Sequence, residues 1–322
     1  MKPIPSSQRP NHLALAALVL AGALVGGTRP AHAGPLMDRI QAHRAARTGE
    51  ATPAATASHG TQKVLRNVSY GPDADQRMDV YLPAAGQPIQ GVIFMVHGGG
   101  WKHGDKRHDN VVDQKVARWV PKGLALVSIN YRMLPEAPVQ TQADDVRQAL
   151  AHAQRLATQW QVPADRFVLM GHSAGAHLVS LVSADPARAL EQGARPWLGV
   201  VSLDSAAMDV PRVMKQRHMK LYDEAFGTDP AYWQTVSPWH QLTTGVPPSL
   251  LVCSSERPDH PCQQARDFAA KVRSLGGRSD VHPEALSHGE INARLGLPGP
   301  YTEAVERFVA GLHPALAQAL RP

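Results

Sequence analysis

The sequence predicts an α/β fold in which helices cover both faces of a mostly parallel sheet. Short apolar runs alternate with longer segments of helical periodicity over most of the chain. Several of the short runs are continuous stretches of Val, Ile and Leu, which is typical of strands buried on both faces. Such alternation favours parallel strands joined by crossover helices. With 322 residues and a hydrophobic content of 43%, the chain can bury a large core in one domain of this kind.

The expected elements follow one another along the chain. Strands are expected over Met78–Leu82, Gly91–His97, Ala125–Asn130, Phe167–Gly171, Val200–Leu203, Leu250–Cys253 and Ser279–His282. Helices are expected over Val111–Val120, Ala143–Trp160, Ala174–Ser183, Gln263–Leu275 and Thr302–Leu312. The segment from Pro186 to about Leu242 is less regular and is rich in Trp, Tyr, Phe and Met. Its large side chains are expected either to line a substrate pocket or to form a local core.

The N-terminus has the features of a secretory signal peptide. Two basic residues precede an apolar run over residues 13–25, and the small residues Ala31 and Ala33 stand before an expected cleavage site. The run is short for a permanent membrane span, and a retained anchor is the alternative. We therefore expect export, to the periplasm or the medium, after cleavage near Ala33. The expected parts of the chain are a signal peptide (1–33), an N-terminal extension (34–63) and an α/β domain (64–322).

Charge and cysteine content exclude several classes of partner. The formal net charge of +6 comes from scattered Lys and Arg, and no basic run is interleaved with aromatic residues, so nucleic-acid binding is not expected. The two cysteines, Cys253 and Cys262, favour a disulfide in an oxidising compartment, with two separate thiols as the alternative. A zinc site needs more ligands than this pair offers, so no metal site is expected.

The strongest motif runs from Gly171 to Gly175 and fits the pattern G-x-S-x-G. A buried-strand pattern ends just before it and a helical pattern begins just after it. A strand that runs directly into a helix needs a sharp turn, which holds the hydroxyl of Ser173 out at the carboxyl end of the sheet. The start of the following helix also favours a developing negative charge. This context identifies Ser173 as the expected nucleophile.

A glycine triplet upstream complements that serine. His97-Gly98-Gly99-Gly100-Trp101 directly follows an expected strand. Consecutive glycines let the backbone approach a substrate closely, and backbone N–H groups stabilise the oxyanion of acyl transfer. We assign an oxyanion hole to the N–H groups of Gly99, Gly100 and Ala174, whereas a flexible turn is the plainer alternative. His97 is expected to hold the loop and Trp101 to wall the pocket.

At these two motifs the sequence resembles the α/β-hydrolase superfamily. It is most similar to the bacterial esterase and lipase group with an HGGG oxyanion motif, and to kynurenine-formamidase-like relatives. A third stretch, Asn130-Tyr131-Arg132-Met133-Leu134-Pro135-Glu136-Ala137-Pro138 followed by Asp144-Asp145-Val146, is similar to a segment of this group. The resemblance spans about Asn67 to Ala310. It implies an α/β-hydrolase fold with a catalytic triad and is weakly specific for a substrate.

The resemblance also implies a chain order of serine, then acid, then histidine. The base is expected in a loop between the last strand and the final helix, and His288 occupies such a loop. His282 is the competitor, but it falls within the expected strand.

The acid of the triad is expected after the strand that follows the irregular segment. An alignment without gaps puts Arg257 where relatives usually carry the acid, so this sequence departs from the family pattern. We prefer Asp259, because Asp is the commoner acid and the expected disulfide would brace its loop. Glu256 resembles the acid position of some formamidase-like relatives and is the alternative acid. Asp204 and Asp209 are weaker alternatives, for which capping or turn formation is the simpler role.

These residues together predict a serine carboxylic ester hydrolase that acts on small to medium acyl esters. His288 would accept the proton of Ser173, and the acyl-enzyme would then be hydrolysed by water without a metal or organic cofactor. The preference for esters rests on the resemblance, since the same triad cleaves amides. One alternative is an arylformamidase-like amidase acting on N-formylkynurenine-type substrates. The other is a non-catalytic hydrolase fold used for binding.

Overall fold

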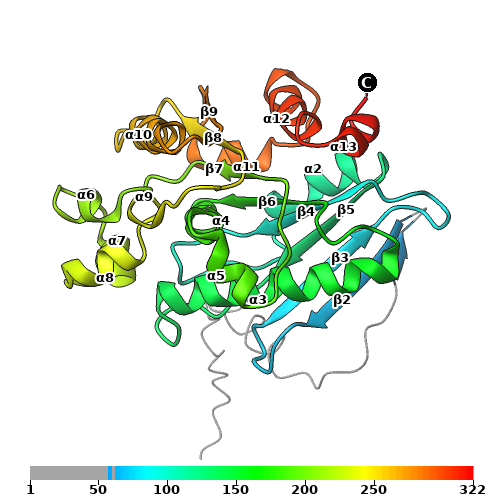
Figure 1. The fold of residues 1–322 in the computed structure, drawn as a ribbon, viewed down its shortest axis with the longest axis horizontal. Coiled ribbons are helices and arrows are strands. Elements are labelled where there is room, and N and C mark those ends of the chain that lie inside the picture. Colours follow the sequence, from blue (N-terminus) through cyan, green and yellow to red (C-terminus); the bar gives the residue numbers. More distant parts are fainter. Residues whose placement is uncertain (1–56, 60–61, 322) are drawn as a thin grey trace, which may run out of the picture. The chain divides into compact units, whose positions relative to one another are not determined.

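A computed structural model describes residues 57–59 and 62–321 (Figure 1). The expected signal peptide, its cleavage site near Ala33 and most of the expected extension lie outside the described residues. Two short stretches before residue 64 already pair with the sheet, so the sheet begins a few residues earlier than the expected domain boundary.

The described residues form one nine-stranded sheet in the order β1-β2-β3-β5-β4-β6-β7-β8-β9. The first three strands pair antiparallel, β3 also pairs antiparallel with β5, and every later pair is parallel. The strands are β1 (Ala57–His59), β2 (Gln62–Ser69), β3 (Arg77–Leu82), β4 (Gly91–Val96), β5 (Leu124–Ile129), β6 (Phe167–His172), β7 (Gly199–Leu203), β8 (Ser249–Ser254) and β9 (Ser279–Glu284).

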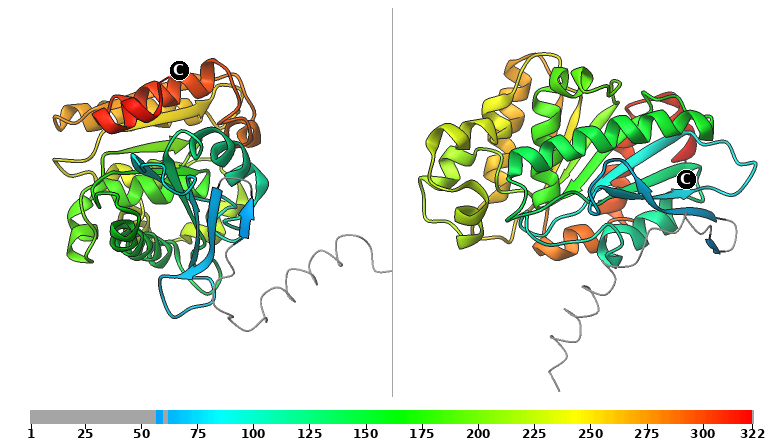
Figure 2. Two further views of the ribbon diagram at one scale, coloured as in Figure 1. Left: turned by 90° about the vertical axis from the view of Figure 1, so that its right-hand side faces the viewer. Right: turned by 90° about the horizontal axis from the view of Figure 1, so that it is seen from below.

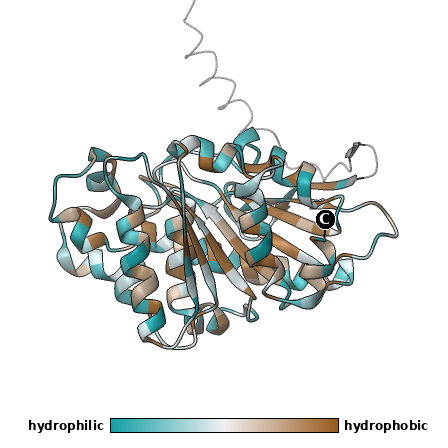
Figure 3. Ribbon diagram, turned by 90° about the horizontal axis from the view of Figure 1, so that it is seen from above, coloured by the Kyte–Doolittle hydropathy of each residue, from teal (hydrophilic) through white to brown (hydrophobic). Residues whose placement is uncertain are grey.

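The central strands are buried along their whole length. Every residue of β4, β5, β6, β7 and β8 is buried, which explains why these strands appear in the sequence as continuous apolar runs. Figure 3 shows these hydrophobic strands between helices with hydrophilic outer faces. The expected mostly parallel sheet is therefore confirmed.

Helices cover both faces of this sheet (Figures 1 and 2). The cores show that α3, α4 and α10 pack on one face, whereas α2, α12 and α13 pack on the other. Among the described residues, no helix combines the length and apolar character needed to cross a bilayer. The helices are α2 (Asp109–Trp119), α3 (Val139–Ala157), α4 (Ala174–Ala184), α5 (Pro186–Glu191), α6 (Val210–Met214), α7 (Lys220–Phe226), α8 (Pro230–Thr235), α9 (Pro238–Gln241), α10 (Pro261–Ser274), α11 (His288–Ala293), α12 (Pro300–Ala310) and α13 (Pro314–Ala319), with a 3₁₀ turn at Thr158–Trp160.

The segment that looked irregular in the sequence contains short helices whose large side chains pack inward. Tyr222 and Phe226 are buried and Met208 is almost fully enclosed, all within the core clusters. Trp233 donates its indole N–H to the carbonyls of Phe226 and Gly227 at 3.1 Å each, at the end of α7. Of the two expected roles for this segment, a local core accounts for most of its large side chains. Helices of four to seven residues are too short to show a helical period in sequence.

The expected disulfide is confirmed. Cys253 in β8 is bonded to Cys262 in the first turn of α10, and their Cα atoms are 5.1 Å apart. Both cysteines are buried in the small core that α10 forms against the sheet. The bond therefore ties the start of α10 to the end of β8.

A buried lysine joins two helices on the opposite face. Lys115 of α2 is 1% exposed, and its Nζ donates to the carbonyls of Asn110 at 3.1 Å and Asn292 at 2.7 Å. Asn292 belongs to α11, so this contact ties α11 to α2. Burial lowers the pKa of Lys115 to about 7, because the charged ammonium is poorly solvated there.

The free energy of unfolding should therefore depend on pH through Lys115. The unfolded chain keeps the lysine proton up to about pH 10, whereas the native chain releases it near pH 7. Between these values the unfolded state binds more protons, so stability should rise with pH. Urea unfolding of the wild type and Lys115→Met at a series of pH values should show the wild type gaining stability relative to the variant across this window. A stability difference that stays constant with pH would contradict it.

Candidate active site

Three side chains from separate parts of the chain converge at the carboxyl ends of the parallel strands. Ser173 follows β6, Asp204 follows β7, and His288 lies after β9 as the first residue of α11. The Oγ of Ser173 is 2.9 Å from Nε2 of His288, and Nδ1 of His288 is 2.6 Å from Oδ2 of Asp204. The three groups thus form a continuous chain of hydrogen bonds from carboxylate to imidazole to hydroxyl.

Ser173 occupies a sharp turn between β6 and α4. Its backbone has φ 57° and ψ −119°, a conformation that L-residues rarely adopt and that stores strain at functional sites. Its N–H donates to the carbonyl of Leu203 at 2.9 Å, which ties the turn to the end of β7. The flanking glycines allow the turn to be this tight: a Cβ at Gly171 would lie 2.3 Å from the carbonyl oxygen of Gly175, and one at Gly175 would lie 2.2 Å from that of Val96.

Neighbouring side chains hold the backbone around His288 in place. Ser287 and Glu290 form a capping box at the start of α11, which fixes the direction in which the chain enters this helix. His172, at the end of β6, donates from Nε2 to the carbonyl of His288 at 2.9 Å, and the two rings pack with centroids 4.5 Å apart. The Oγ of Ser254 donates to the carbonyl of Leu286 at 2.7 Å, just before the cap.

Asp204 is fully buried and its carboxylate is well satisfied. Besides the contact with His288, Oδ1 accepts from the N–H of Ser254 at 2.8 Å and Oδ2 accepts from Nη1 of Arg257 at 2.8 Å. Burial by itself raises the pKa of this carboxyl group. The hydrogen bond from His288, the charge of Arg257 and the bond from Ser254 outweigh burial and lower the pKa of Asp204 below its usual value.

The structure does not bring the expected acids to His288. Asp259 is exposed and pairs with Arg257, whose Nε donates to Oδ1 at 2.9 Å. Glu256 is exposed in the same loop, and no hydrogen bond joins its carboxylate to His288. The competitor base His282 bonds to Glu284 at 2.7 Å and makes no contact with Ser173.

The acid prediction differs from the structure because it followed chain position instead of strand pairing. β7 and β8 lie side by side in register, with Leu203 opposite Val252, so both strands end beside the imidazole. Asp204 leaves β7 at once with φ 58°, and its N–H donates to the carbonyl of Val252 at 2.8 Å. The usable signal in the sequence was that Asp204 stands directly after a buried strand, as Ser173 does.

The glycine loop after β4 lies directly beside the nucleophile. A Cβ at Gly98 would come within 2.9 Å of the Cβ of Ser173. Gly99 and Gly100 have φ values of 121° and 61°, in the region that favours glycine. Within the described part of the chain, the N–H groups of Gly99, Gly100 and Ala174 donate to no protein acceptor. They are therefore available to a substrate oxygen.

Neighbouring residues hold this loop in place. His97 is fully buried, and burial lowers its pKa to about 4, so its ring is neutral and donates from Nδ1 to the carbonyl of Gly98 at 2.7 Å. Tyr131 stacks on His97 and donates to its carbonyl at 3.1 Å. Trp101 is 3% exposed, and its indole N–H donates to Nδ1 of His177 at 3.3 Å. His97 holds the loop as expected, whereas Trp101 packs into the core.

The stretch around Arg132 braces the same region. Arg132 forms a two-pronged ion pair with the buried Asp145, at 2.6 Å and 2.9 Å. The N–H of Leu134 and the side chain of Gln142 both donate to the carbonyl of Trp101, at 2.9 Å each. This stretch therefore holds the end of the glycine loop at Trp101 in place. Across residues 57–59 and 62–321, no three His, Cys, Asp or Glu side chains gather as a metal ion would require.

Comparison with known proteins identifies a family and several similar proteins. The sequence profile of the BD-FAE family matches residues 78–272. Esterase LipC of Mycobacterium tuberculosis (strain ATCC 25618 / H37Rv) is 26% identical over 280 residues, covering 79% of this chain and 66% of LipC. Kynurenine formamidase of Danio rerio is 28% identical over 120 residues, covering 37% of this chain and 39% of that protein. The chain thus spans less than two thirds of the length of these relatives.

A solved structure shows the same fold. The truncated form of a carbohydrate esterase from gut microbiota superposes with a TM-score of 0.66 and 16% identity, covering 83% of this chain and all of that one. This likeness confirms the expected α/β-hydrolase fold, and the relatives confirm the resemblance found in the sequence.

The hydrogen bond between His288 and Asp204 should be visible in solution. An imidazole N–H that donates to a buried carboxylate at 2.6 Å should give a strongly downfield proton resonance in an NMR spectrum. We expect Asp204→Asn to abolish this resonance and Asp259→Asn to keep it. A spectrum in which Asp259→Asn alone removes the resonance would contradict the contact described above.

Proposed function

Because the chain belongs to the BD-FAE family, we propose that it is a serine carboxylic ester hydrolase with Ser173 as nucleophile, His288 as general base and Asp204 as the acid of the triad. The observation that carries the proposal is the hydrogen-bonded chain from Asp204 through His288 to Ser173, at 2.6 Å and 2.9 Å. The named esterases among the relatives support an ester substrate.

The chemistry follows from this geometry. Nε2 of His288 accepts the proton of Ser173 as Oγ forms a bond to the carbonyl carbon of the ester. The electron pair of the carbonyl moves to its oxygen, and His288 then returns the proton to the departing alcohol as the acyl-enzyme forms. Water attacks the acyl-enzyme with His288 again as base, which releases the carboxylic acid and regenerates Ser173. Asp204 orients the imidazole and stabilises its charged form.

The oxyanion is stabilised by backbone N–H groups. We assign this role to Gly99, Gly100 and Ala174, whose free N–H groups lie on the loop beside Ser173 and directly after it. The start of α4, an eleven-residue helix, adds the positive end of its dipole at the same point. Donors fixed in advance in this way stabilise the transition state without reorganisation.

The substrate is proposed to be a small or medium acyl ester. The large side chains of the irregular segment could have lined an acyl pocket. Several of them pack into the core instead, as Tyr222 and Phe226 do. The matched region of kynurenine formamidase makes a formamide the competing substrate. We also propose that the protein is exported, and the Cys253–Cys262 disulfide supports an oxidising compartment.

The substrate class is tested by comparing p-nitrophenyl acetate, butyrate and octanoate with N-formylkynurenine. We expect the wild type to hydrolyse the short esters fastest and Ser173→Ala to lose turnover of every substrate, because Ser173 supplies the hydroxyl that His288 contacts. Formamide turnover that exceeds ester turnover would assign the protein to the amidases. Equal ester rates in the wild type and Ser173→Ala would overturn the mechanism.

The acid is tested by two matched substitutions of the same kind. Asp204→Asn removes the charge that orients His288, and kcat should fall by roughly 10⁴-fold. Asp259→Asn changes an exposed carboxylate that does not reach the imidazole, and the loss should be at most about tenfold. Steady-state kinetics on p-nitrophenyl butyrate give both values. A larger loss in Asp259→Asn than in Asp204→Asn would return the role of acid to Asp259.

A further inference from the structure

Arg257 occupies the loop position where related sequences are expected to carry the acid of the triad. Its side chain is 14% exposed and lies between two carboxylates. Nη1 donates to Oδ2 of Asp204 at 2.8 Å and to the backbone carbonyl of the same residue at 3.2 Å. On its other side, Nε and Nη2 form a two-pronged pair with Asp259. The guanidinium is therefore fixed from both ends.

We propose that Arg257 is a positioning residue of the active site, which holds the carboxylate of Asp204 in line with His288 and offsets its buried charge. The inference rests on the proposed function, because it assigns Arg257 a part in the same triad. It also gives Asp259 a defined role, since this carboxylate clamps the guanidinium from the side away from the imidazole.

The geometry at one oxygen carries the argument. Oδ2 of Asp204 accepts from both His288 Nδ1 and Arg257 Nη1, at 2.6 Å and 2.8 Å. These two nitrogens are themselves only 2.9 Å apart. A guanidinium has donors only, so no hydrogen bond joins the two nitrogens when Nδ1 carries its proton. The close approach of two donors is tolerated because both bind the same carboxylate oxygen.

This arrangement affects the protonation of the imidazole. A fixed positive charge beside His288 disfavours a second positive charge on its ring, and the bond from Arg257 to Asp204 reduces the attraction of that carboxylate for a proton. A general base acts in its neutral form, so removal of Arg257 is expected to change how activity depends on pH. Loss of Arg257 would leave the buried carboxylate of Asp204 beside the imidazole without its cation.

Around this network, Glu290 of the capping box has a lowered pKa and Lys115 donates to the carbonyl of Asn292 on the same helix, whereas three other titratable groups are uncharged. His172 of β6 packs on the imidazole, and burial lowers the pKa of His172 to about 3. Tyr222 of α7 lies beside Arg257, and burial raises its pKa to about 12. Burial also raises the pKa of Tyr301 of α12, whose hydroxyl donates to the carbonyl of Ile291 in α11. Arg257 is thus a cation in direct contact with both the acid and the base of the proposed triad.

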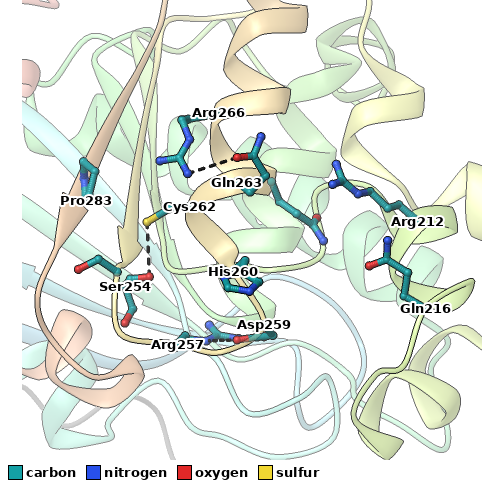
Figure 4. A pocket seen from close by; sticks show the side chains of 12 residues that line it. Arg212, Gln216, Ser254, Arg257, Asp259, His260, Cys262, Gln263, Arg266 and Pro283 are labelled. Carbon is teal, nitrogen blue, oxygen red and sulfur yellow. Dashed lines mark hydrogen bonds and ion pairs between the residues drawn. The ribbon is translucent and has the colours of Figure 1, made fainter.

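A solvent-accessible cavity opens on the far side of Arg257. It has a volume of about 490 Å³ and is lined by both Arg257 and Asp259 (Figure 4). The exposed side chains of Arg212, Gln216 and Arg266 also line it, so small solutes can enter from the surface. Truncation of Arg257 would therefore leave a space beside Asp204 that a small cation can reach.

The first test compares Arg257→Met and Arg257→Lys with the wild type on p-nitrophenyl butyrate. In Arg257→Met, the acidic limb of the kcat/KM profile should move to higher pH by about one unit, which lowers kcat/KM about tenfold on that limb. Arg257→Lys keeps the positive charge but loses the paired N–H donors of the guanidinium. Its acidic limb should therefore lie between those of the wild type and Arg257→Met. Arg266→Met is the matched control, because Arg266 lines the same cavity and bonds only to Gln263. Its profile should match the wild type.

Chemical rescue provides a second readout that a merely structural role would not move. Millimolar guanidinium should restore kcat/KM and the acidic limb of Arg257→Ala, whereas the same concentration of urea, which is planar and neutral, should not. Neither solute should change Arg266→Met. Thermal unfolding of each variant identifies any that fail to fold. If Arg257→Met or Arg257→Ala does not fold, the pH profile is measured on Arg257→Lys, whose side chain still fills the site.

The outcomes separate this inference from the proposed function. Wild-type turnover together with an unchanged acidic limb in Arg257→Met would overturn the role of Arg257 alone. Absence of turnover in the wild type would overturn the esterase proposal. In that case, the downfield proton of His288 is followed in the same variants. Its retention, unchanged, in Arg257→Met would overturn the positioning role as well.

Discussion

The proposed active site depends on the register of four parallel strands. β4, β6, β7 and β8 are paired so that Val96 lies opposite Gly171, His172 opposite Leu203, and Leu203 opposite Val252. Their carboxyl ends therefore form one edge, and the residue after each strand is delivered to the same place. A shift of one residue in any pair would turn the following side chain to the opposite face. The buried side chains of these strands maintain the register.

Backbone contacts across this edge convert the register into a precise site. The N–H after β6 donates to the end of β7, and the N–H after β7 donates to the end of β8. Each turn is thus anchored to the next strand in the sheet. Close packing completes the constraint, because Gly171 and Gly175 leave no space for a Cβ between the turn and its neighbours. The strained backbone of Ser173 persists because these contacts hold it.

Buried carboxylates recur in this protein, and their partners decide their roles. Asp79 is surrounded by two arginines and a lysine, and Asp145 is paired with an arginine, so both brace the fold around β3 and the glycine loop. Asp204 is equally buried, but it shares one oxygen between Arg257 and His288. A buried charge requires compensation in every case. Of these three carboxylates, Asp204 is the one whose partners continue through His288 to the hydroxyl of Ser173.

Local sequence determined the fold class, the disulfide partners and the sharp turn that carries Ser173. These features depend on neighbours in the chain: apolar runs define buried strands, and glycines beside a serine define a tight turn. Tertiary structure decided which carboxylate meets His288, because the pairing of β7 with β8 joins segments that are distant in sequence. The same pairing puts Arg257 against Asp204. No local pattern encodes either contact, because a cluster of charged residues has the same sequence pattern whether it faces solvent or the end of a neighbouring strand.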